Sequence, residues 1–213
     1  TLTGVIEKIP YFKELGITYV HFMPLLSARK GENDGGFAVA DYREIDPRFG
    51  NMEEFRRLVA MLNQEGIHVC MDYVVNHTAK EHSFARRAQA GEQEFQDMYY
   101  VFDTDELPKA YETTMPEVFP KVAPGNFTYY PEMGKWAMTS FYEFQWDLNY
   151  HNPRVFLEMA DTLLFLANTG ARVIRLDAVP FMWKVLGTNC RNLPQVHTLL
   201  RMFRIITEIV CPG

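Results

Sequence analysis

The sequence predicts an α/β fold built on parallel strands. Helical and strand patterns alternate along the chain, their connections are short outside one long segment, and polar residues collect where strands end. Such alternation favours parallel strands joined by right-handed crossovers. A doubly wound sheet and a (β/α)8 barrel both fit, and both place functional residues beyond the carboxyl ends of their strands.

The first elements are a helix and a strand. Apolar spacing over residues 6–15 predicts a helix that ends at Gly16, and Pro10 either kinks this helix or marks the first turn of a shorter one. Residues 17–23 then have the apolar, β-branched character of a strand.

A capping-box spacing marks the next helix. Asn51 precedes it, and Glu54 follows three residues later. The stripe expected to face the core is Phe55, Leu58, Val59 and Leu62. Gly66 ends this helix, and residues 67–73 form a strand that has apolar residues on one face and His68, Cys70 and Asp72 on the other.

A long polar, aromatic and Pro-rich segment occupies about residues 78–150. It is too long for a plain loop, so we expect a small irregular subdomain inserted between strand and helix. Asn152 and Pro153 then begin a helix that runs to Gly170. A strand at 171–179 and a helix at 193–210 complete the pattern.

Two full charges interrupt the strand at 171–179, which otherwise has the composition of a buried strand. Arg175 and Asp177 are two residues apart, so their side chains project to the same side. Burying charges is costly unless they are paired. The pair predicts either a catalytic site at a strand end or a structural ion pair.

Composition excludes several classes of function. The net charge of −6, with no basic stripe, argues against nucleic-acid and anionic-membrane partners. Cys70, Cys190 and Cys211 lack metal-type spacing and do not make a disulfide framework. We therefore expect a reducing, cytoplasmic compartment, although Thr1 is not a natural start and a signal segment upstream is compatible with the sequence.

Three predicted strand ends carry polar and aromatic residues. They are Asp34-Gly35-Gly36-Phe37, the stretch from Asp72 to His77, and Arg175-Leu176-Asp177. None contains a Gly-rich phosphate-binding fingerprint, which disfavours a nucleotide site. Carboxylates, a histidine and an aromatic ring suit a sugar, because they accept hydrogen bonds from hydroxyls and cover the C–H face of the ring.

The motifs resemble conserved regions of the α-amylase superfamily of retaining α-glycosidases. They are Asp-x-x-x-Asn-His-Thr at 72–78, Gln-Trp-Asp-Leu-Asn at 145–149 and Arg-x-Asp at 175–177. Within that superfamily, residues 9–12, 140–149 and 177–184 resemble amylosucrase and sucrose hydrolase. The similarity runs over essentially the whole chain.

The resemblance implies part of a (β/α)8 TIM barrel, about strands 2 to 4 with their flanking helices. Residues 1–77 are expected to form the first part of the barrel. Residues 78–150 are expected to form an inserted subdomain B after the third strand, and residues 151–213 to continue the barrel up to the point before its fifth strand.

The resemblance also implies roles for single residues. Asp177 matches the nucleophile that forms a covalent glucosyl intermediate, and Arg175 the residue that keeps this carboxylate ionised and aimed. The substrate-binding positions implied are Asp34, Phe37, Asp72, His77, Phe141 and Gln145. Phe37 stands where amylosucrases generally carry tyrosine, so a stacking face is kept while a hydroxyl contact is lost.

Each binding residue taken singly also has a structural interpretation. His77 fits a strand-end histidine bonded to backbone, Asp72 and Asp34 fit turn chemistry, and Phe37 and Phe141 fit core aromatics. Their joint order and spacing favours the site. For Asp147 the alternative stays open, because in amylases this region often supports a calcium site or the fold of the subdomain.

The activity implied is that of a bacterial enzyme of carbohydrate metabolism that transfers glucosyl from sucrose to an α-1,4-glucan and releases fructose. Its partners are sucrose and an α-glucan or oligosaccharide, with no cofactor and no metal. The alternatives are hydrolysis of sucrose or another α-glucoside, and a non-catalytic binding module, against which the intact Arg175 and Asp177 argue.

We expect the sequence to be part of a longer chain. The acid/base glutamate of such enzymes ends the fifth strand, and it and the third acidic residue are expected beyond Gly213. Glu208 lies in the predicted final helix and does not replace this glutamate. The segment alone is therefore predicted to be inactive, and to be unstable or to associate because apolar surface is left uncovered.

Overall fold

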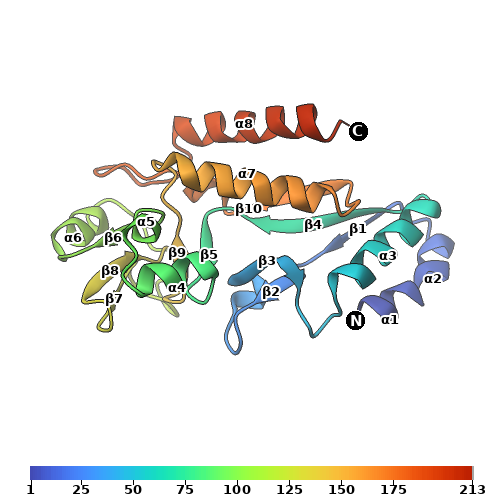
Figure 1. Ribbon diagram of the computed structural model, residues 1–213, viewed down its shortest axis with the longest axis horizontal. Coiled ribbons are helices and arrows are strands. Elements are labelled where there is room, and N and C mark those ends of the chain that lie inside the picture. The colour runs from blue at the N-terminus through green and yellow to red at the C-terminus, as the bar shows by residue number, and fades with distance from the viewer. Residues whose placement is uncertain (213) are drawn as a thin grey trace. The chain divides into compact units, whose positions relative to one another are not determined.

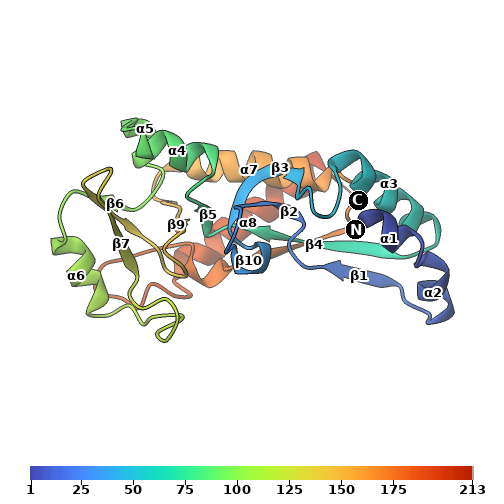
Figure 2. The same cartoon turned by 90° about the horizontal axis from the view of Figure 1, so that it is seen from below.

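The computed structural model describes residues 1–212, which form two compact units. The first unit contains residues 1–73, 160–177 and the chain from Phe203 onwards, and the second contains residues 74–159 and 178–202. Figures 1 and 2 show the elements of both units in two orientations.

The first unit carries a parallel sheet with its helices. Its elements are α1 (Leu2–Ile6), α2 (Ile9–Glu14), β1 (Tyr19–Phe22), β2 (Leu26–Ala28), η1 (Asp34–Gly36), β3 (Val39–Ile45), α3 (Met52–Gln64), β4 (His68–Val74) and β10 (Val173–Asp177), with the second halves of α7 (Pro153–Ala167) and α8 (Pro194–Val210).

The sheet has the strand order β1–β4–β10. β1 and β4 run parallel, as Figure 2 shows, with His21 opposite Cys70 and Phe22 opposite Met71. The prediction of parallel strands separated by helices is confirmed for this pair. α3 lies between them in sequence, which is the β/α repeat that a crossover connection produces.

The capping box predicted for α3 is present. Asn51 Oδ1 accepts from the Glu54 backbone N–H at 2.9 Å, and Glu54 Oε2 accepts from the Asn51 backbone N–H at 3.0 Å. All four residues of the predicted stripe, Phe55, Leu58, Val59 and Leu62, are buried. The helix therefore begins and packs as the sequence pattern predicts, because both signals are local.

Pro10 marks the start of a short helix rather than a kink in a longer one. It occupies the first turn of α2, where its missing N–H is not needed. This is the second of the two alternatives that the sequence left open for Pro10; the separate helix that precedes it, α1, was not predicted. The hairpin of β2 and β3, paired antiparallel, was also not predicted.

β10 is more exposed than its composition suggests. Val173 is 37 % exposed, and the side chain of Arg175 is 47 % exposed. The prediction of a buried strand was wrong in this respect. The reason is positional, because β10 lies at the edge of the three-stranded sheet and β4 is its neighbour in that sheet.

The second unit contains the segment predicted to be an irregular inserted subdomain. Its elements are β5 (His77–Ala79), α4 (Ser83–Gln89), α5 (Gln93–Gln96), β6 (Val101–Phe102), α6 (Glu106–Glu112), β7 (Phe127–Tyr130), β8 (Lys135–Met138), β9 (Gln145–Asp147) and η2 (Val179–Phe181), with the first halves of α7 and α8. β6, β8 and β7 form one antiparallel sheet, and β5 pairs with β9 in another.

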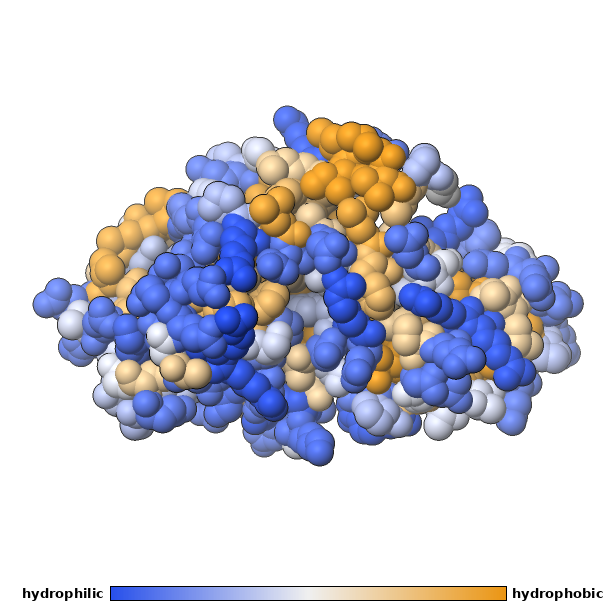
Figure 3. All heavy atoms as spheres, in the orientation of Figure 1, coloured by the Kyte–Doolittle hydropathy of each residue, from blue (hydrophilic) through white to orange (hydrophobic). Residues whose placement is uncertain are grey.

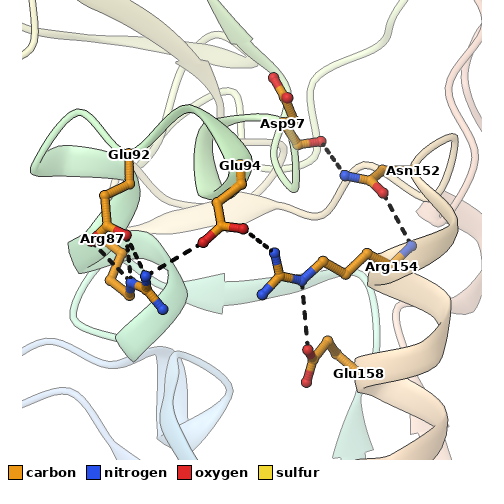
Figure 4. A network of polar contacts seen from close by, with 7 residues as sticks. All are labelled: Arg87, Glu92, Glu94, Asp97, Asn152, Arg154 and Glu158. Atoms are coloured by element: carbon orange, nitrogen blue, oxygen red, sulfur yellow. Dashed lines mark hydrogen bonds and ion pairs between the residues drawn. The ribbon is translucent and has the colours of Figure 1, made fainter.

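A network of charged residues joins α4 and α5 to the first turns of α7 (Figure 4). Arg87 bonds to Glu92 and Glu94, and Arg154 bonds to Glu94 at 2.8 Å. Both guanidinium groups also lie over the Phe95 ring, at 3.8 and 4.8 Å from its centroid. The shared acid and the shared ring hold these helices together.

One surface of α8 is apolar. Figure 3 shows apolar side chains gathered over this helix, and those exposed on it are Met202, Ile205, Ile209 and Val210. Their spacing is that of one helix face. No helix among residues 1–212 has the length and apolar character needed to cross a bilayer.

Candidate active site

Three charged side chains meet near the carboxyl ends of β4 and β10. Arg175 Nη1 donates to Asp72 Oδ1 at 2.8 Å, and Arg175 Nη2 lies 3.0 Å from Asp177 Oδ1. The prediction that Arg175 and Asp177 share one side of the strand is confirmed. What the sequence pattern did not predict is that the same guanidinium also holds Asp72, from the neighbouring strand.

Burial differs among the three groups. The Asp72 side chain is fully buried, Asp177 keeps 19 % of its side-chain surface exposed, and Arg175 keeps 47 %. The hydrogen bond to Asp72 raises the pKa of Arg175, opposed by desolvation and assisted by the charges of both carboxylates. The arginine is thus a fixed cation that orients one buried and one accessible carboxylate.

His21 of β1 is a further member of this cluster. Its Nε2 lies 3.1 Å from Asp72 Oδ1, the oxygen that Arg175 also contacts. Asp72 Oδ2 is buried and has no hydrogen-bond partner within residues 1–212. His21 was missed in the sequence, where its signal was the one imidazole in the strand predicted at residues 17–23. A buried carboxylate oxygen without a partner among these residues is unusual and marks Asp72 as a candidate functional residue.

Asp34 and Phe37 lie together on the turn that follows β2. Asn33 Oδ1 accepts from the Gly36 backbone N–H at 3.1 Å and so closes the turn. Gly36 has φ +101°, and a Cβ there would lie 3.0 Å from Pro24 Cβ, so this position requires glycine. Asp34 and Phe37 are both half-buried.

In the second unit, two predicted site residues, Phe141 and Gln145, lie beside a third, His77 of β5. His77 Nε2 lies 3.1 Å from Gln145 Nε2 of β9, and the His77 and Phe141 ring centroids are 4.9 Å apart. Phe141 also packs on Phe181 of η2, at 5.0 Å. His77 and Gln145 are buried. A buried imidazole beside an aromatic face and an amide is suited to a hydroxyl-bearing ring.

Asp147 makes a buried ion pair with Lys184. The two atoms, Nζ and Oδ2, are 2.6 Å apart, and both side chains are fully buried. Ser140 donates to Asp147 through its backbone N–H at 3.1 Å and through its hydroxyl at 2.6 Å. Of the two interpretations left open for Asp147, these contacts support a role in the fold of the subdomain. Lys184 was missed in the sequence, where it is the one charge between Ala178 and Gly187.

No group of three or more His, Cys, Asp or Glu side chains within residues 1–212 is arranged to hold a metal ion.

The chain matches the family described as the alpha-amylase catalytic domain over residues 1–204. It is 35 % identical over 195 residues to a glucosylglycerate phosphorylase from Spirochaeta thermophila, which covers 91 % of this chain and 31 % of that protein. It is 34 % identical over 202 residues to a trehalose synthase from Pimelobacter, covering 94 % of this chain and 34 % of that protein. The chain thus spans about a third of the length of these relatives.

A solved structure shares the fold. The trehalulose synthase MutB from Pseudomonas mesoacidophila superposes with a TM-score of 0.84 at 25 % identity, over 96 % of this chain and 38 % of that one. The fold is therefore a mixed α/β fragment of the barrel-type catalytic domain, as predicted. The named activities of these proteins differ from one another, so the coarse class is common to them and the specific reaction is not.

Proposed function

We propose, since this chain belongs to the family of alpha-amylase catalytic domains, that the protein containing it is a retaining enzyme acting on α-glucosides, with Asp177 as its nucleophile. The observation that carries this proposal is the Arg175 bridge between Asp72 and Asp177 near the ends of two neighbouring strands. A purely structural ion pair needs one acid, whereas this arginine orients a second, accessible one.

In the proposed reaction, Asp177 attacks the anomeric carbon of a glucosyl unit. The carbon–oxygen bond to the leaving group breaks, and a covalent glucosyl–aspartate forms. Arg175 Nη2, at 3.0 Å from Oδ1, keeps the carboxylate ionised and directs it. An acceptor hydroxyl or water then takes the glucosyl unit from Asp177.

A second carboxylic acid must protonate the leaving group, roughly 5 Å from the nucleophile in a retaining enzyme. Asp72 is not suited to this role, because one of its oxygens is bonded by both Arg175 and His21 as an acceptor. We propose that the acid lies in the part of the protein outside these 213 residues. We propose that Asp72 and His77 bind glucosyl hydroxyls, and that Asp34, Phe37, Phe141 and Gln145 are further substrate-binding residues.

We further propose sucrose as the glucosyl donor, with transfer to an α-glucan and release of fructose. A sequence resemblance and a structure of a similar protein support sucrose as the donor. The stretches 140–149 and 177–184 resemble amylosucrase and sucrose hydrolase, and a variant of the structurally similar MutB has been crystallised in complex with the substrate sucrose. The alternative donors are trehalose-type and other α-glucosides, as the name of the matched trehalose synthase indicates.

Covalent trapping tests the chemistry. The intact protein is incubated with an activated 2-deoxy-2-fluoroglucoside, which slows release of the intermediate, and is then digested and analysed by mass spectrometry. We expect the label on Asp177 and none in the Asp177→Asn variant. A label on another residue, or no label while substrate is still consumed, would contradict the assignment of the nucleophile.

Product analysis tests the donor separately. Intact protein is offered sucrose, trehalose or maltose in parallel, and free fructose and free glucose are quantified. Fructose in excess over glucose indicates transfer, and equal amounts indicate hydrolysis. Turnover of trehalose or maltose without turnover of sucrose would reject the sucrose proposal and leave the retaining mechanism standing.

A further inference from the structure

Lys184 is a buried cation that contacts Asn76, and Asn76 in turn contacts His77. Besides Asp147, its Nζ donates to Asn76 Oδ1 at 3.2 Å and to the Phe181 carbonyl at 2.5 Å. An ammonium has donors and no acceptor, so each neighbour must present an oxygen. Asn76 must therefore turn Oδ1 towards Lys184, which leaves its NH2 group for its other neighbour.

That other neighbour is the His77 ring. Asn76 Nδ2 lies 3.3 Å from His77 Nδ1, and both side chains are buried. An amide NH2 donates, so Nδ1 is required to accept and to carry no proton. In a neutral imidazole the proton then lies on Nε2. The orientation of Asn76 thus selects the tautomer of His77.

The orientation of Gln145 favours the other tautomer of His77. Its Oε1 accepts from the Tyr142 backbone N–H at 3.1 Å, and this orientation directs Nε2 at His77 Nε2, which lies 3.1 Å away. The two amides cannot both donate to a ring that carries one proton. Asn76 accepts a charge-assisted bond from Lys184, and such a bond is roughly twice as strong as a neutral one such as the bond between the Tyr142 N–H and Gln145 Oε1, which Gln145 loses if its amide turns. We therefore expect the Gln145 amide, and not the Asn76 amide, to rotate.

We propose that Lys184 is a positioning residue that, through Asn76, fixes His77 in the tautomer with its proton on Nε2. Nε2 then acts as a hydrogen-bond donor and Nδ1 as an acceptor from Asn76, while the Gln145 amide turns its oxygen to His77. The ion pair with Asp147 keeps the ammonium in place. The suggestion that Nε2 donates to a sugar oxygen rests on the proposed function. The assignment of the tautomer does not depend on it.

Nitrogen-15 NMR of histidine-labelled intact protein reads the tautomer directly, because the protonated and unprotonated ring nitrogens differ in chemical shift and in their couplings to ring protons. The His77 signals are assigned by their loss in His77→Gln. We expect the proton on Nε2. A proton on Nδ1, or on both nitrogens, would overturn the proposal. No turnover is needed, so this result is independent of whether the protein acts on a glucoside.

Removing the anchor should move the proton. The double variant Lys184→Met, Asp147→Asn deletes both buried charges together and frees the Asn76 amide to turn. Gln145 should then donate to Nε2, and the His77 proton should shift to Nδ1. Lys135→Met makes the same substitution at a lysine of the same unit that pairs with Asp103 instead, and it should leave the tautomer unchanged. An unchanged His77 in the double variant would overturn the role of Lys184.

A second variant covers the case in which the double variant does not fold. Asn76→Asp has the same shape, keeps an oxygen for Lys184, and replaces the NH2 group by an oxygen that only accepts. Nδ1 must then donate, so a proton should appear on Nδ1. Retention of an unprotonated Nδ1 would show that residue 76 does not set the tautomer, and the proposal would fail.

Discussion

Replacing Lys184 by methionine tests how strongly the second unit depends on its buried ion pair. Lys184 and Asp147 are both fully buried, 2.6 Å apart. Methionine keeps most of the side-chain volume, so little cavity is created. The Asp147 carboxylate, however, loses its counter-charge and keeps only the two Ser140 donors. Removing one partner of a buried pair costs about 3–5 kcal/mol of unfolding free energy.

Lys135→Met is the matched control for this measurement. Lys135 lies 2.5 Å from Asp103, but the Asp103 side chain is 80 % exposed. Exposed pairs contribute about 0–1 kcal/mol, because water and salt screen them. Lys184→Met should therefore lower the unfolding midpoint several times more than Lys135→Met does.

Thermal unfolding of the intact protein, followed by circular dichroism, measures both variants under the same conditions. Adding Asp147→Asn to Lys184→Met should recover part of the loss, because no charge is then left buried without a partner. The reasoning is refuted if Lys184→Met and Lys135→Met shift the midpoint equally, or if the double variant is less stable than Lys184→Met alone.

Three further outcomes are expected. Asp177→Asn should reduce kcat about ten-thousand-fold or more while leaving the unfolding midpoint nearly unchanged. A raised KM with an unchanged kcat in steady-state assays would contradict its role as nucleophile. Asn51→Ala removes the side-chain half of the α3 capping box and should cost about 1 kcal/mol in unfolding free energy, and an unchanged unfolding free energy would contradict the role of this cap. Burial opposes ionisation of Asp46, but hydrogen bonds from Arg48 and from the backbone outweigh it and lower the Asp46 pKa below its ordinary 3.8. The contribution of Asp46 to stability is therefore complete above pH 3.8 and is lost as the pH falls through the folded-state pKa. Asp46→Asn should flatten the pH dependence of the unfolding midpoint below about pH 4, and an unchanged slope would count against the Arg48 pairing.

Local patterns in the sequence predicted much of the framework. The Asn51–Glu54 spacing gave the start of α3, because a capping box involves residues three apart. The shared side of Arg175 and Asp177 followed from the two-residue period of a strand. The helix after Asn152 and Pro153 followed in the same way, from residues adjacent in the chain.

Features that depend on distant residues were not predictable in this way. Arg175 reaches Asp72, which is 103 positions earlier, only because β4 and β10 are neighbours in the sheet. The exposure of β10 depends on the same strand order rather than on its composition.

The sequence by itself determined the start and buried face of α3, the motif that places this chain in its family, and the shared side of Arg175 and Asp177, since each rests on spacing along a helix, a turn or a strand. Only the tertiary structure decided that Arg175 also holds Asp72, that His21 joins them, and that Lys184 is buried against Asp147. The physical reason is that a charge is stabilised by the groups around it in space, and those groups come from segments that only the folded chain brings together.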